Sequence, residues 1–160
     1  MRSLSLILVL AAMLPLHVHA ADLGALMPDN VGDWQRVELL TGPEAQEAVD
    51  KLHGKALPAE ASAVARYAKP EQKGRPAEAW VSRVSSEKEA RRQTGQMVHL
   101  MYENPRSPFK NPSRLDHAGH AVYRFEGMGQ SHLIWFSGDL VWWISVDEAA
   151  EQVMLDAFCK

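Results

Sequence analysis

Residues 131–148, SHLIWFSGDLVWWISVDE, constrain the fold most strongly, because they hold three of the chain's five tryptophans around one Gly-Asp pair. Glycine as the first of two central residues favours a type II′ turn between antiparallel strands. A two-residue turn at Gly138 and Asp139 places Trp135 opposite Trp142. Both faces of this hairpin are then apolar. One face holds Leu133, Trp135, Leu140, Trp142 and Ile144, and the other holds Ile134, Phe136, Val141 and Trp143.

The strands of a sheet with one solvent-exposed face usually alternate apolar with polar residues. This hairpin does not alternate in that way, so we expect other parts of the molecule or a partner to bury both of its faces. Burying one large aromatic side chain is worth roughly 2–3 kcal/mol, which makes exposure of a whole second face costly. Three explanations are open. Helices cover one face and the segment 103–117 the other; or one face binds a protein partner or a second copy; or the sheet curls over a cavity for an apolar ligand.

The remaining pattern predicts an α+β fold of a single domain. Apolar or alternating runs bounded by turn residues predict strands at 34–40, 61–69, 77–86, 120–127, 132–137 and 140–146. Helical spacing and capping residues predict helices at 43–54, 85–105 and 148–160. We therefore expect a largely antiparallel, twisted sheet of about six strands with three helices mainly on one face, in the order β-α-β-β-α-β-β-β-α.

The first twenty residues predict a secretory signal peptide. Arg2 precedes an apolar stretch of thirteen residues, which is followed by small residues at a plausible cleavage site after Ala20. The stretch is too short for a lasting membrane span, so we expect residues 21–160 to form one periplasmic or secreted domain. Without Arg2, sixteen of the 17 basic side chains remain against 20 acidic ones, a balance that argues against a nucleic-acid partner.

The segment 103–117 and the residues after it hold the candidate metal ligands. Asp116, His117 and His120 lie close together in LDHAGH, a spacing that suits zinc or copper, although zinc takes a third and usually a fourth protein ligand. Ordinary surface histidines are the alternative. The sequence contains no G-x-S-x-G, H-E-x-x-H, phosphate loop or C-x-x-C motif, so it predicts no catalytic residue and no cofactor.

Cys159 is the only cysteine and cannot form an internal disulfide. It is expected to be a small apolar residue near the end of the last helix, and the alternatives are a reactive thiol or a disulfide that links two copies in a homodimer.

The sequence therefore favours an exported, non-enzymatic binding or accessory module of the cell envelope. Its partner would be a protein or an apolar small molecule, held by an aromatic hairpin face. The candidate binding residues are Trp135, Phe136, Trp142 and Trp143. The alternative function is a small metal-binding protein or metal-dependent enzyme centred on Asp116, His117 and His120.

Overall fold

The fold is described from a computed structural model, for residues 22–71 and 74–160. The predicted signal peptide, residues 1–20, lies outside the described residues. None of the described helices is long and apolar enough to cross a membrane.

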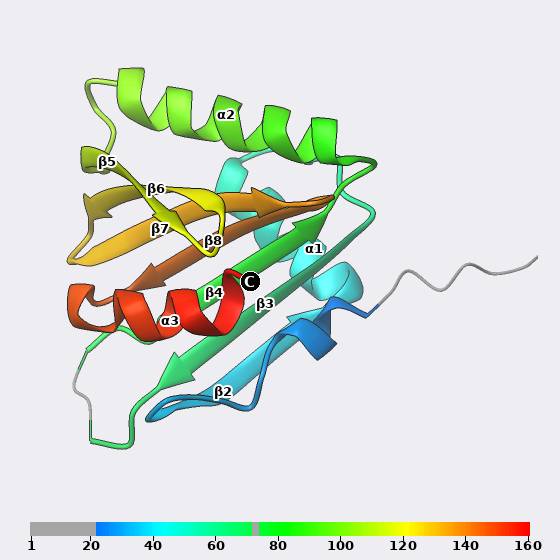
Figure 1. The fold of residues 1–160 in the computed structure, drawn as a ribbon. Coiled ribbons are helices and arrows are strands. Elements are labelled where there is room, and N and C mark those ends of the chain that lie inside the picture. Colours follow the sequence, from blue (N-terminus) through cyan, green and yellow to red (C-terminus); the bar gives the residue numbers. More distant parts are fainter. Residues whose placement is uncertain (1–21, 72–73) are drawn as a thin grey trace, which may run out of the picture.

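One open antiparallel sheet of eight strands forms the centre of this α+β domain (Figure 1). Its spatial order is β1-β2-β3-β4-β8-β7-β6-β5, so the chain builds one half of the sheet and then returns from the far edge to the middle. The strands are β1 (Asn30–Val31), β2 (Trp34–Thr41), β3 (Ala61–Ala68), β4 (Ala77–Arg83), β5 (Lys110–His117), β6 (His120–Gly127), β7 (Gln130–Ser137) and β8 (Leu140–Val146).

The sheet is larger than the six strands expected, because β1 and β5 are added at its two edges. β5 replaces the second half of the segment 103–117 that was expected to be a loop. It pairs with β6 and contains a β-bulge, since the register shifts between Lys110 and Ser113 and Asn111 has a φ of 51°. Pro112 is tolerated there because an edge strand has one side without a ladder partner.

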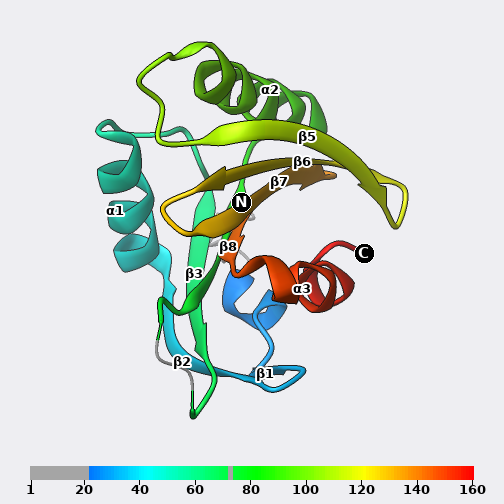
Figure 2. The same ribbon diagram turned by 90° about the vertical axis from the view of Figure 1, so that its left-hand side faces the viewer.

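The helices cover the two faces of the sheet unequally (Figure 2). α1 (Gly42–His53) and α2 (Glu87–Glu103) pack on one face, against β3 and against β7 and β8 respectively. α3 (Glu151–Phe158) and the short 3-10 helix η1 (Leu23–Leu26) pack on the opposite face. The prediction that the helices lie mainly on one face therefore holds for α1 and α2. The third helix, α3, covers the opposite face, which is the second apolar face of the hairpin.

The register predicted for the β7–β8 hairpin is confirmed. Trp135 pairs with Trp142 and Ser137 pairs with Leu140 across the turn. Gly138 has a φ of 56°, the left-handed value that the first central residue of a type II′ turn requires. Trp135 and Trp142 stack in parallel with ring centroids 5.6 Å apart, and they belong to the main core beneath α3.

The connection from α2 to β5 packs tightly over β6. A Cβ atom added at Gly127 would lie 2.8 Å from the carbonyl oxygen of Pro108 and 3.0 Å from Cδ1 of Phe109. In contrast, a Cβ atom at Gly95, in the middle of α2, would meet nothing within 4 Å. Glycine at position 127 is therefore required by the close approach of the residues before β5.

We predict opposite effects for alanine at these two glycines. Gly127→Ala should lower the free energy of unfolding by about 1–3 kcal/mol, because the methyl group displaces the backbone at Pro108. Gly95→Ala should raise it by up to about 1 kcal/mol, because alanine is the better helix former. Urea unfolding followed by circular dichroism measures both. Equal shifts for the two variants would contradict the packing described here.

Candidate binding groove

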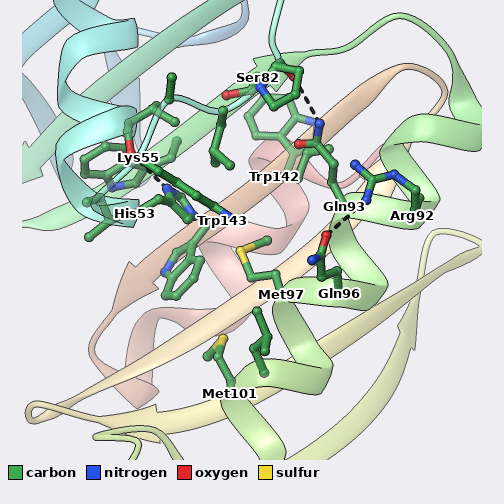
Figure 3. Close-up of a pocket in the computed structure, with 18 of the residues that line it drawn as sticks. His53, Lys55, Ser82, Arg92, Gln93, Gln96, Met97, Met101, Trp142 and Trp143 are labelled. Carbon is green, nitrogen blue, oxygen red and sulfur yellow. Dashed lines mark hydrogen bonds between the residues drawn. The ribbon is translucent and has the colours of Figure 1, made fainter. Parts of the chain in front are cut away.

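A groove opens on the outer face of the sheet between α1 and α2, above β4 and β8 (Figure 3). Its volume is about 560 Å³. The two helices lie on either side of the middle strands, so neither covers the centre of this face. We call this hollow the α1–α2 groove.

Two tryptophans from neighbouring strands form the floor of the groove. Trp80 of β4 is paired with Trp143 of β8, so the two side chains project from the same face of the sheet and both line the groove. Both are only partly buried. Val141 extends this floor along β8. Trp80 also packs against the cluster beneath α1, and Trp143 packs against the cluster beneath α2. The central strands therefore place two partly exposed tryptophans between the helices, at the floor of the groove.

Apolar side chains from both helices form the walls. Leu52 near the end of α1 is 55% exposed, and Leu100 in α2 is 59% exposed, although both line the groove. Met97 projects from α2 toward the floor (Figure 3). The two exposed leucines, on the two helices that flank the tryptophan floor, leave apolar surface of the groove accessible to solvent.

Hydrogen bonds fix the α1 wall to the sheet. Ser62 of β3 donates to Oε1 of Gln46 in α1 over 2.9 Å. Gln46 in turn donates to Asp50, whose carboxylate accepts from the backbone N–H of Leu57 over 2.9 Å. The segment that follows α1 is therefore held at the rim of the groove by the helix itself.

The two walls are also joined directly. Gln93 of α2 donates through its amide nitrogen to the carbonyl oxygen of Pro58 over 3.0 Å (Figure 3). The same amide group donates to Glu89 over 2.9 Å, which fixes its orientation. This bridge sets the separation of the walls.

An aromatic cluster closes the groove beside Trp143. The ring of Phe109 meets His132 edge-on at 4.8 Å and Trp143 at 5.4 Å, measured between centroids. The indole N–H of Trp143 donates to Oγ of Ser145 over 3.0 Å. These contacts hold the Trp143 ring in place on the floor.

His132 supports this cluster as a buried neutral imidazole. Its Nε2 lies 3.0 Å from the carbonyl oxygen of Gly127, which can only accept, so Nε2 carries the proton. Nδ1 lies 2.9 Å from the hydroxyl of Ser145 and is then an acceptor. Burial lowers the pKa of His132 below its usual value, and the hydrogen bond to Gly127 opposes this shift.

Three basic side chains line the groove. Lys55 and His53 lie on the α1 side, and Arg92 lies on the α2 side (Figure 3). Arg92 is bound to Glu89 by two hydrogen bonds of 2.6 and 2.8 Å, and this contact lowers the pKa of Glu89 to about 2. Within the described part of the chain, no carboxylate lines the groove.

The four hairpin residues proposed from the sequence fall on different sides of the sheet. Trp143 lies on the floor of the groove. Trp142 also contacts the edge of the groove, but its ring stacks on Trp135 in the main core on the other face of the sheet. Phe136 is half-buried beneath the guanidinium of Arg91, 5.3 Å from its ring centre. Trp135 is fully buried in the core. Sequence reasoning missed Trp80, Leu52 and Leu100. In the sequence, each is simply an apolar residue of a predicted strand or helix, and nothing distinguishes it from a core residue.

The candidate metal ligands lie at the turn between β5 and β6, away from the groove. Asp116 pairs with Arg114, His117 lies 3.4 Å from Asp156, and Nε2 of His120 lies 3.1 Å from the carbonyl oxygen of Lys160. Among residues 22–71 and 74–160, no group of three or more His, Cys, Asp or Glu side chains is placed to hold a metal ion. Metal binding by these residues therefore stays a prediction from the sequence.

Cys159 is fully buried beside these residues, with its thiol 3.7 Å from the carbonyl oxygen of His117. Burial raises the pKa of this thiol to about 11. The thiol packs in the main core, as expected for a small apolar residue. A disulfide between two copies would require this end of the chain to leave the core.

Comparisons of the chain with protein-family models, with curated proteins and with solved structures found no match. A functional assignment therefore starts from the groove.

We predict that His132 makes the fold less stable in mild acid. The unfolded chain protonates this histidine near its ordinary pKa of 6.5, whereas the folded protein resists protonation to a lower pH. The folded state then holds fewer protons, so the free energy of unfolding falls as the pH decreases below about 6.5, by at most about 1.4 kcal/mol per pH unit.

Urea unfolding of the wild type and of His132→Gln at pH 7.5 and pH 5.5 measures this effect. All other titrating side chains are the same in both proteins, so their contributions cancel when the two losses of stability are compared. The wild type should lose more stability than the variant between the two pH values. An equal loss in both proteins would show that His132 does not titrate differently on folding.

Proposed function

We propose that this protein is a non-enzymatic binding module that holds an apolar small molecule in the α1–α2 groove. The observation that carries the proposal is the pair of exposed leucines, Leu52 and Leu100, on opposite walls of the floor formed by Trp80 and Trp143. An apolar ligand lying on this floor would remove all four side chains from water, which favours binding at about 25 cal/mol per Å² of apolar surface.

The shape of the groove favours a small molecule over a protein partner. Its volume of about 560 Å³ lies within the roughly 300–1,000 Å³ range of small-molecule sites. Such sites are lined mainly by apolar and aromatic side chains with a few polar groups at their edges, and this groove has the same composition.

The polar groups of the groove favour binding over catalysis. Ser82 shares its hydroxyl with Ser62 at 2.9 Å, and Nδ1 of His53 lies 2.9 Å from the carbonyl oxygen of Val49. Ser82 and His53 therefore do not form a hydrogen bond with each other, whereas a catalytic nucleophile requires an adjacent base.

We also propose a location in the cell envelope, and this part of the proposal rests on the signal-peptide pattern of residues 1–20.

We predict that Leu100→Asp weakens binding of the neutral fluorescent probe N-phenyl-1-naphthylamine at least about tenfold, because a carboxylate replaces apolar contact surface in the wall. Since Leu100 is 59% exposed, the free energy of unfolding should change by no more than about 0.5 kcal/mol. Probe fluorescence during titration gives the affinity.

Tyr102→Asp is the matched control. Tyr102 is also in α2 and is 69% exposed, but it does not line the groove. Its variant should bind the probe as the wild type does. If Leu100→Asp and Tyr102→Asp bind the probe with the same affinity, or if the wild type does not bind it, the groove is not the binding site.

A further inference from the structure

The charge of the groove lining narrows the class of ligand, provided that the groove binds an apolar molecule as proposed above. The whole chain has a formal net charge of −3, yet the ionisable side chains that line the groove are all basic: Lys55, His53 and Arg92. Among the described residues, the groove lining therefore contains basic side chains and no carboxylate, whereas the chain as a whole is acidic.

Lys55 supplies the charge that is available to a ligand. Arg92 already has a partner in Glu89, which compensates its charge. The ammonium group of Lys55, in contrast, forms no ion pair or hydrogen bond with any other residue of 22–71 or 74–160. Lys55 is exposed at the rim on the α1 side, directly beside the apolar floor.

The Lys55 backbone is held in this position although its side chain is free. Its N–H donates to the carbonyl oxygen of Asp50 over 3.2 Å, as part of the turn that ends α1. The next residues are tied to α1 through Leu57 and to α2 through Pro58. The fold therefore fixes the point at the rim from which the Lys55 side chain extends.

We propose that the ligand is a single-chain amphiphile with an anionic head group, a carboxylate or a phosphate. Its alkyl chain lies on Trp143 between the leucine walls, and its head group lies at the rim beside the Lys55 ammonium group. The opposite charge favours an anionic head over a cationic head on the same chain. A neutral head group receives only the contribution of the apolar floor.

Displacement of N-phenyl-1-naphthylamine at pH 7.5 and 0.15 M salt tests this assignment. The competitors are decanoate, decyl phosphate, decanol and decylammonium, each kept below the concentration at which it forms micelles. The anions should bind about fivefold or more tightly than decylammonium, as expected for one partly exposed charge pair, with decanol between them. The tighter anion identifies the head group.

Lys55→Glu should reverse the order, so that decylammonium binds more tightly than decanoate, while the affinity for decanol changes less than about twofold. Lys88→Glu is the control, because Lys88 is an exposed residue of α2 that does not line the groove. It carries the same change in charge at a position outside the groove lining and should keep the wild-type order.

The results separate this inference from the proposed function. If decanol displaces the probe but decanoate, decyl phosphate and decylammonium bind equally, the anionic assignment is wrong and the groove remains an apolar site. The same conclusion follows if Lys88→Glu acts as Lys55→Glu does. If none of the decyl compounds displaces the probe from the wild type, both proposals are wrong.

Discussion

The pairing of β7 with β8 is the interaction on which the rest of the structure depends, because it assigns each apolar side chain of the hairpin to one of two faces. A shift of one residue would exchange the faces, and the glycine turn at residue 138 prevents that shift. The face that holds Trp135 and Trp142 is closed by α3 and η1. The opposite face, which holds Trp143, is covered by α1, α2 and the residues before β5.

These elements cover the second face only at its sides. α1 packs over Val64 of β3, and α2 packs over Ile134 of β7, so the middle strands between them lie beneath the gap. The bridge from Gln93 to Pro58 and the aromatic contacts of Phe109 hold this arrangement in place. The groove is thus the part of a two-sided apolar sheet that two helices leave open, and the same arrangement places Lys55 at its rim.

Local chemistry explains which features could be predicted from the sequence. The turn residues Gly138 and Asp139 define the hairpin register without knowledge of the fold, and the capping pair Ser86 and Glu89 correctly predicts the start of α2, where Ser86 accepts from the N–H of Glu89 over 3.2 Å. β5 could not be predicted, because an edge strand with Pro112 and a bulge has the composition of a loop. The sequence identified Trp143 as a candidate binding residue, but it could not predict the groove in which Trp143 lies. Leu52 and Leu100 resemble core residues of amphipathic helices, and only the tertiary separation of α1 and α2 leaves them exposed.

The five tryptophans allow a direct test, because their indole N–H groups report on both faces in one NMR spectrum. In a titration of the ¹⁵N-labelled protein with decanol, the account predicts that the indole signals of Trp80 and Trp143 shift together. The signals of Trp34 and Trp135, which are buried in the core beneath α3, should stay in place. Shifts at Trp34 and Trp135 with none at Trp80 and Trp143 would contradict the claim that the open face of the sheet is the binding site.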